Sequence, residues 1–219
     1  MLEFMPMHRV LLIVIQFAVV LFAISIHEAA HAWMADRCGD STARFMGRVT
    51  LNPIAHIDPI GTVLFPIILA LMGAPVFGWA KPVIVNPRNF KDSRRSHMLV
   101  AAAGPGANIL AALVASGLFQ LLRQFGMVSL YQGSMGVQSL SMVLIYLVLI
   151  NLYLAVFNLI PIPPLDGSGI LKSILKGEAR AAYAGMEKYG FIILLALIWL
   201  GGLDIIARPI YRLVILLLS

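Results

Sequence analysis

Long apolar stretches that alternate with short polar segments dominate this chain. The first stretch covers about residues 8–37, and between residues 10 and 26 its only polar members are Gln16 and Ser25. The two other uninterrupted stretches cover about residues 98–122 and 140–160. Each is close to or longer than the roughly 20 residues that a helix needs to cross the hydrocarbon core of a bilayer. The pattern therefore predicts three membrane-spanning helices at these positions.

Two further apolar stretches are interrupted. Residues 59–78 contain about a dozen strongly apolar residues and are broken by Pro66. This length is short for a full crossing, and it favours a re-entrant or interfacial segment. The last stretch, residues 189–219, is broken by Gly201, Gly202, Asp204 and Pro209. We expect it to form either one span with an interfacial helix or a tight hairpin.

The segments between these runs carry residues that break helices. In residues 79–95, WAKPVIVNPRNFKDSRR, two prolines exclude a helix, and the VIV tripeptide predicts a short strand or hairpin near residues 80–86. Residues 161–177, PIPPLDGSGILKSILKG, end one helix and start a shorter one. The whole pattern predicts a single all-α polytopic membrane domain over residues 1–219. It has about four to six membrane segments, one of them re-entrant.

The composition agrees with a membrane protein. Of the 219 residues, 60% are hydrophobic and 12% are charged, with a mean hydropathy of +0.92, whereas a soluble domain has about 25% charged residues. No room is left for a separate soluble domain. The one cysteine, Cys38, excludes intrachain disulfides and cysteine-rich zinc sites. The length of the first run and its ionisable residues favour a retained membrane helix over a cleaved signal peptide.

The net charge of +6 at pH 7 is carried mostly by the segments between the apolar runs. Three Lys or Arg residues lie in 36–58, five in 75–97 and four in 167–188, whereas residues 123–138 and the N-terminal segment carry one each. The positive-inside rule then places the three basic segments in the cytoplasm and the N-terminus outside. Membrane topology therefore explains the positive charge, and no nucleic-acid partner is expected.

The candidate chemistry is concentrated near the end of the first apolar stretch, in the sequence SIHEAAHAW at residues 25–33. On a helix, His27 and His31 project from one face, one turn apart, so both imidazoles can reach a single zinc ion. Glu28 can then act as general base on a zinc-bound water. Ionisable residues inside a membrane span are costly, and coordination to a metal ion would offset that cost.

A catalytic zinc ion needs a third protein ligand and one open position. Asp166 is the leading candidate because it follows the end of an apolar run, after prolines that unwind the backbone and before Gly167. Asp166 could instead cap the helix that begins near Gly167, and the residues alone leave both roles open. Asp58 and Asp204 are weaker candidates for the third ligand.

Three motifs taken together resemble the site-2 protease family of intramembrane zinc metalloproteases. They are HEAAH at 27–31, AAAGPGAN at 101–108 and FNLIPIPPLDG at 157–167, and the resemblance covers about residues 10–175. No PDZ insertion is recognisable. Residues 50–66, TLNPIAHIDPIGTVLFP, are additional to the minimal core of the family and look like those of its small members that lack a PDZ domain.

The resemblance implies a membrane zinc endopeptidase that holds one Zn²⁺ ion per chain. It implies that His27, His31 and Asp166 are the metal ligands and that Glu28 is the general base. It also implies that Asn158 lies near the reacting carbonyl group, where its amide would stabilise the oxyanion.

Two further residues are possible accessories of this centre. Asn108, one helical turn after Gly104, is expected to hydrogen-bond a substrate backbone, while Gly104 and Gly106 are expected to permit close helix packing. His56, beside the expected re-entrant segment, is either an auxiliary ligand, a gate residue or an ordinary loop histidine.

The expected reaction is hydrolysis of a peptide bond in or near a transmembrane segment of another membrane protein. The partners are therefore transmembrane protein substrates and the lipid bilayer, and the VIV segment is expected to hold an extended substrate by β-augmentation. The expected location is the cell membrane of a bacterium or archaeon, with the active site nearer the cytoplasmic face. The alternatives are a membrane metal-binding protein without hydrolytic activity and a pseudoprotease scaffold.

Overall fold

The computed structural model describes residues 6–72, 79–129 and 134–219. Within these residues every regular element is a helix and no strand is present, which confirms the predicted all-α class. The longer helices are α1 (Pro6–Arg37), α4 (Ser93–Gln124), α5 (Met135–Asn158), α6 (Asp166–Ile174), α7 (Gly177–Met186), α8 (Gly190–Trp199) and α9 (Gly202–Leu218). The short ones are α2 (Thr42–Phe45), α3 (Phe65–Leu71), a π-helical turn (Pro59–Leu64) and 3₁₀ turns at Pro53–His56, Pro87–Asn89 and Glu187–Tyr189.

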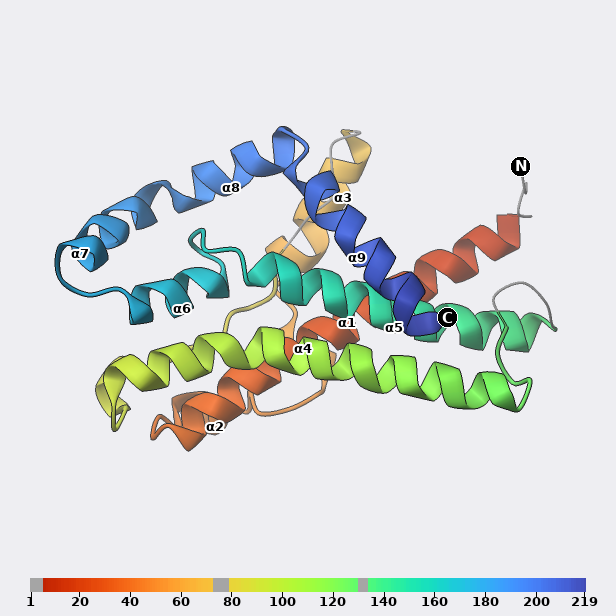
Figure 1. Cartoon of the computed structure of the whole chain (residues 1–219), viewed down its shortest axis with the longest axis horizontal. Helices are drawn as coiled ribbons and strands as arrows, with labels where there is room; N and C mark the ends of the chain where they lie inside the picture. Colours follow the sequence, from red (N-terminus) through yellow and green to blue (C-terminus); the bar gives the residue numbers. More distant parts are fainter. Residues whose placement is uncertain (1–5, 73–78, 130–133) are drawn as a thin grey trace.

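The core is built from α1, α4 and α5, which run side by side along the long axis of the molecule (Figure 1). α4 packs against both of the others and runs in the opposite direction to them, and α9 packs against α5 and α4. The largest buried apolar cluster lies where α4, α5 and α9 meet, and its members include Ala112, Phe119, Val148, Leu152, Ile210 and Val214. These contacts fix the relative positions of the helices that carry the motifs.

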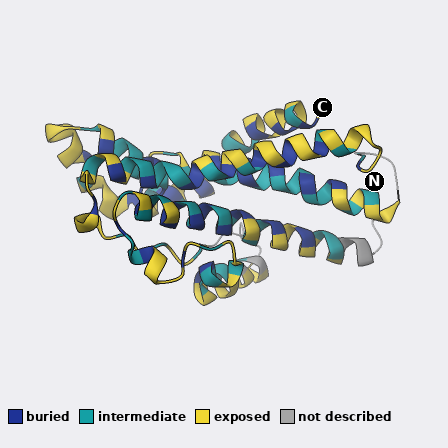
Figure 2. Cartoon of the chain, turned by 90° about the horizontal axis from the view of Figure 1, so that it is seen from below, coloured by how far each residue is buried: buried dark blue, intermediate teal, exposed yellow. Residues whose placement is uncertain are grey.

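Among the described residues, four helical stretches are long and apolar enough to cross a membrane: Val10–Arg37, Ser93–Gln124, Met135–Asn158 and Gly177–Trp199. The first three match the helices predicted from the apolar runs. Large apolar side chains such as Ile13, Phe17, Leu110 and Val114 are exposed on the outer faces of the helices, and Figure 2 shows exposed residues along the length of the bundle. Because lipid tails are as apolar as these side chains, this surface fits an integral membrane protein.

The interrupted run after Asp58 forms only a short helical rod. The π-helical turn and α3 contribute six and seven residues, which extend about 20 Å at about 1.5 Å per residue. The Asp58 carboxylate caps the start of this rod by accepting hydrogen bonds from the N–H groups of Ile60 and Gly61 at 3.0 and 2.7 Å. The rod is too short to cross a bilayer. Residues 73–78 of the expected re-entrant segment lie outside the described residues.

The predicted strand or hairpin near residues 80–86 is wrong. These residues form no ladder with a neighbouring strand, and Pro82 lacks the N–H group that a ladder would need. Three N–H groups of this segment instead donate to acceptors on different parts of the chain: Lys81 to the His56 carbonyl (2.9 Å), Val83 to Glu28 Oε2 (3.2 Å) and Asn86 to Asp40 Oδ2 (2.6 Å). The β-branched residues favour an extended backbone, but within the described ranges no partner strand lies beside them.

The last apolar run is two helices joined by a bend. α8 ends at Trp199, and α9 begins at Gly202 after Gly201, which has a positive φ of 79° that favours glycine. A side chain at Gly202 would meet Leu197 of α8, so α8 and α9 approach each other closely at the bend.

Candidate metal centre

The two histidines of the HEAAH motif project from α1 toward α4. Both residues are buried, with exposed fractions of 7% for His27 and 8% for His31, and their Nε2 atoms lie 3.0 Å apart. The i, i+4 spacing on one helix produces this approach, as the sequence predicts.

Asp166 joins the two histidines from the helix that follows α5. It is the first residue of α6, and its Oδ2 atom lies 3.1 Å from His27 Nε2 and 3.3 Å from His31 Nε2. The N-cap position of α6 belongs to Leu165, and no side chain caps this helix. The structure therefore gives Asp166 a place beside the histidines and not the capping role.

A tight turn after α5 carries Asp166 into this position. A Cβ atom on Gly167 would lie 2.6 Å from the Ile160 carbonyl oxygen and would also collide with the Leu159 carbonyl. Only glycine fits at such a close approach of two backbone segments. Gly167 therefore allows the carboxylate to reach α1.

The three atoms fit a metal ion. A tetrahedral zinc ion with bonds of about 2.0–2.1 Å separates its ligand atoms by about 3.3 Å, and the three distances here are 3.0, 3.1 and 3.3 Å. Among the described residues, the buried Oδ2 atom of Asp166 also has no hydrogen-bond partner. In the described part of the chain, His27, His31 and Asp166 form a group that could hold a metal ion.

The Nδ1 atoms of both histidines face acceptors on α4. His31 Nδ1 lies 2.7 Å from the Val100 carbonyl oxygen, and His27 Nδ1 lies 2.6 Å from Asn108 Oδ1. If each Nδ1 carries the hydrogen, each Nε2 presents a lone pair to Asp166 Oδ2. Three lone pairs at such short range repel one another unless a cation lies among them, so the donor set favours a bound metal ion.

Asp166 is suited to an anionic role. A carboxylate is a common zinc ligand, and its negative charge would neutralise part of the charge of a divalent cation.

Gly104 makes space for the centre. A Cβ atom at this position of α4 would lie 2.7 Å from His27 Cε1 and His31 Cε1 and would collide with His31 Nε2. At Gly106, by contrast, a Cβ atom would meet nothing within 4 Å. The close packing expected of both glycines is therefore present at Gly104 only, and the neighbours there are the histidine rings.

Glu28 is half-buried beside the histidines, at the side where the extended segment 79–86 passes. Its Oε2 atom accepts a hydrogen bond from the Val83 N–H at 3.2 Å. Because Val83 is far away in sequence, only the tertiary structure reveals this contact.

Asn108 lies in the core beside His27. Its side chain is fully buried and contacts His27, the Ala23 carbonyl and Asn151, and its contact with a substrate backbone stays a prediction. Asn151 was missed in the sequence because an asparagine in the middle of an apolar run carries no motif.

Among the described residues, Asn158 and His56 are not members of the three-residue group. Asn158 is the last residue of α5, is half-buried, and donates one amide hydrogen to the Leu154 carbonyl at 3.0 Å. His56 is buried, and its Nε2 atom lies 2.9 Å from the Thr50 carbonyl. The weaker ligand candidates lie elsewhere: Asp58 caps the π-helical turn, and Asp204 lies in the first turn of α9.

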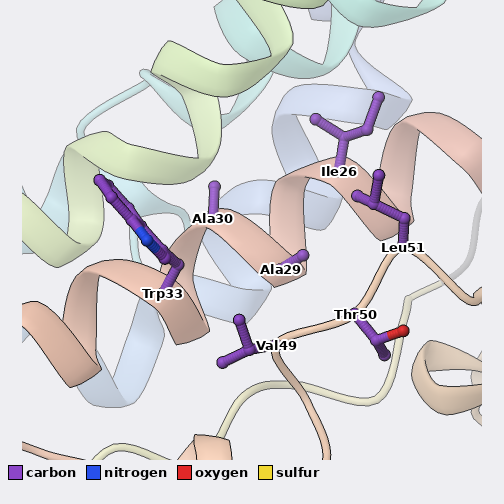
Figure 3. A pocket seen from close by; sticks show the side chains of 7 residues that line it. All are labelled: Ile26, Ala29, Ala30, Trp33, Val49, Thr50 and Leu51. Atoms are coloured by element: carbon purple, nitrogen blue, oxygen red, sulfur yellow. The ribbon is translucent and has the colours of Figure 1, made fainter.

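A second feature lies on another face of α1. An apolar groove of about 400 Å³ lies between this helix and the loop at 49–51, and Figure 3 shows its lining: Ile26, Ala29, Ala30, Trp33, Val49, Thr50 and Leu51. His27 and His31 are not among the lining residues. The groove is therefore separate from the candidate metal centre.

Comparison with known proteins agrees with the geometry of the centre. Residues 15–201 match Peptidase family M50. The chain is 42% identical over 173 residues to the "Putative zinc metalloprotease YwhC" of Bacillus subtilis, covering 79% of this chain and 74% of that protein. It is 28% identical over 178 residues to the "Putative zinc metalloprotease Rip2" of Mycolicibacterium smegmatis, covering 81% of this chain and 64% of that protein. It is 30% identical over 178 residues to the protein of the same name in Mycobacterium tuberculosis H37Rv, covering 81% of this chain and 63% of that protein. No solved structure matches the chain.

Proposed function

This chain belongs to peptidase family M50, whose members are zinc metalloproteases, and from that premise we propose that it is an intramembrane protease. Its reaction is the hydrolysis of peptide bonds in or near transmembrane segments of other membrane proteins. The observation that carries the proposal is the close approach of His27 Nε2, His31 Nε2 and Asp166 Oδ2, which lie 3.0, 3.1 and 3.3 Å from one another. The two histidines lie on a helix that is long and apolar enough to cross a membrane, and Asp166 begins the short helix that follows another such helix.

His27 Nε2, His31 Nε2 and Asp166 Oδ2 are the atoms that would hold the zinc ion. When bound there, zinc polarises a scissile carbonyl and lowers the pKa of a bound water. Three protein ligands leave one coordination position open, which is the arrangement of a catalytic site and not of a structural one.

Glu28 supplies the proton transfer. It stands next to the first histidine on α1, and its Oε2 atom is held by the Val83 N–H. In the proposed reaction Glu28 accepts a proton from the attacking water and delivers it to the leaving amine. A protein that only binds or transports a metal ion does not need such a base beside its ligands.

Asn158 stabilises the charge that develops on the scissile oxygen. The amide has two hydrogens, and one of them is donated to the Leu154 carbonyl. The second is assigned to the oxyanion. The position of Asn158 at the end of α5, shortly before the turn that leads to Asp166, supports this assignment.

The proposed setting is the cell membrane, with the centre nearer the cytoplasmic face. The HEAAH motif lies near the C-terminal end of α1, and Asp166 follows the C-terminal end of α5. These ends adjoin the basic segments that the positive-inside rule assigns to the cytoplasm. The short rod at 59–71 is proposed to enter and leave the membrane on that same side.

The test compares membrane-protein fragments in cells that carry either the wild-type protein or the Glu28→Gln variant. We expect fragments of transmembrane proteins that appear only with the wild-type protein. Identical fragment patterns at equal expression would overturn the assignment of proteolysis and would favour a metal-binding or scaffolding role.

A further inference from the structure

Asn151 is a fully buried residue of α5 that is not one of the candidate metal ligands. We propose that Asn151 acts through Asn108 to fix the proton on His27 Nδ1, and thereby sets the metal affinity of the centre. Asn151 is in this view a positioning residue. The inference rests on the proposed zinc site, but it can be tested without measuring proteolysis.

The orientation of the Asn151 amide follows from a main-chain carbonyl. The Leu147 carbonyl lies 2.8 Å from the Asn151 nitrogen Nδ2. A carbonyl oxygen can only accept a hydrogen bond, so the nitrogen end of this amide must face Leu147. The oxygen end, Oδ1, then points at Asn108 Nδ2, which lies 2.7 Å away.

The orientation of the Asn108 amide follows from its neighbours in the same way. Its Nδ2 atom faces two oxygens, Asn151 Oδ1 at 2.7 Å and the Ala23 carbonyl at 3.1 Å. Each of its two hydrogens therefore has one acceptor, and its oxygen end must face His27 Nδ1 at 2.6 Å. Because that oxygen can only accept, His27 Nδ1 must carry the hydrogen. The lone pair of His27 is left on Nε2, the atom that faces Asp166.

His31 reaches the same state by a shorter route. Its Nδ1 atom faces the Val100 main-chain carbonyl directly, at 2.7 Å, and no side-chain substitution removes that acceptor. His27 instead depends on a relay of two side chains from α4 and α5. The relay therefore makes His27 sensitive to Asn151 on α5, which is the side chain of the relay farthest from the metal centre.

Removing Asn151 Oδ1 would leave one buried hydrogen of Asn108 without an acceptor. Unpaired buried donors are unfavourable, so the Asn108 amide would rotate or shift and would lose its alignment with His27. Residues that orient a ligating histidine typically change metal affinity by about 10- to 100-fold. A loss in this range is the expected size of the effect.

The principal variant is Asn151→Ser. A serine hydroxyl at a helical position can donate to the carbonyl four residues earlier, as Ser25 and Ser173 do in this protein. It would therefore satisfy the Leu147 carbonyl while being too short to reach Asn108. Asn151→Leu, which has a similar size and no polar group, is the second variant if the first does not fold. Ser141→Ala removes another buried polar group of the same helix and is the matched control.

Zinc affinity is measured by chelator competition on the purified proteins in detergent, together with the visible absorption bands of the cobalt-substituted proteins. We expect Asn151→Ser to bind zinc about 10- to 100-fold more weakly and to shift the cobalt bands, while Ser141→Ala matches the wild type in both. The double variant Asn108→Ala/Asn151→Ser should lose no more affinity than Asn108→Ala alone, because Asn151 acts only through Asn108.

Unchanged zinc affinity in Asn151→Ser or Asn151→Leu, or additive losses in the double variant, would overturn the relay. The failure of the proposed function is a separate result. A wild-type protein that binds zinc but cleaves no membrane protein would contradict the protease assignment, while the comparison of affinities would still decide the role of Asn151.

Discussion

The Nε2 atom of His27 lies 3.1 Å from the Oδ2 atom of Asp166. His27 lies near the C-terminal end of α1, and Asp166 follows the C-terminal end of α5. Between them α4 and α5 run in opposite directions (Figure 1), and the short rod at 59–71 is too short to cross a bilayer. In the proposed topology, two crossings separate the two residues, which would return the chain to the same side of the membrane.

Cysteine labelling tests this topology. In a protein whose Cys38 has been replaced, single cysteines are introduced at Ser41, Ser93 and Ser134 and treated with an impermeant reagent in intact cells. We expect the position at 134 to react and the positions at 41 and 93 to stay protected, because the positive-inside rule places the basic segments in the cytoplasm. Permeabilised cells, in which all three should react, provide the control.

Different accessibility at positions 41 and 93 would mean that the segment between them crosses the membrane. An odd number of crossings would then separate α1 from Asp166, and Asp166 could not complete the centre.

The Glu28→Gln protein should retain about one zinc ion per chain and should lose proteolysis by a factor on the order of 10²–10⁴. The amide keeps the shape of the side chain, and its oxygen can still accept the Val83 N–H, but it cannot take a proton from water. Metal analysis and cleavage of a transmembrane substrate by the purified protein measure the two effects. Turnover close to the wild-type rate would remove Glu28 from the role of general base.

The Gly104→Ala variant should lose zinc affinity by about 100-fold, because a Cβ atom there would lie 2.7 Å from His27 Cε1. Gly106→Ala provides the control on the same helix, since a Cβ atom at that position meets nothing within 4 Å. Chelator competition on both variants measures the difference. Equal zinc affinities of the two variants would show that the His27 and His31 rings have enough space beside α4 for the added methyl group.

The His56→Ala variant should keep its zinc content while its turnover changes. His56 Nε2 contacts the Thr50 carbonyl, and the His56 carbonyl accepts the Lys81 N–H. His56 therefore links the loop at 50–56 to the segment at 79–86, whose Val83 N–H donates to Glu28. Metal analysis beside a rate measurement checks both parts. Loss of zinc would instead make His56 a ligand.

The Asp40→Asn variant should be less stable than the wild type at neutral pH. Burial of Asp40 would raise the pKa of its carboxyl group, but hydrogen bonds from Thr42, Asn89 and Asn86 lower this pKa below the usual 3.8. A folded-state pKa below the unfolded value contributes stability above about pH 4, and this contribution is lost as the pH falls through the folded value.

Thermal unfolding of the two proteins between pH 7 and pH 3 measures this difference. We expect the midpoint of Asp40→Asn to lie below that of the wild type at pH 7 and the gap to narrow below about pH 4. A gap that is constant over this range would show that the charge of Asp40 does not contribute to stability.

Much of the helical core could be predicted from the sequence alone. The apolar runs are local features, and each of the three long ones became a helix, because a backbone in an apolar environment satisfies its hydrogen bonds within a helix. The HEAAH spacing is local as well, so the approach of His27 to His31 follows from the helical repeat.

The tertiary structure decided which distant residues meet. Only the packing of the helices shows that, among Asp58, Asp166 and Asp204, it is Asp166 that lies beside the histidines. Only this packing shows that Gly104, and not Gly106, lies against the histidine rings. The VIV tripeptide has the composition of a strand, but a strand needs a partner, and the N–H groups of Lys81, Val83 and Asn86 donate to separate acceptors instead. Asn151 carried no local signal, because its environment is created by α1, α4 and α5 together. A local pattern determines the conformation of a segment, whereas contacts across the chain depend on how all the segments pack.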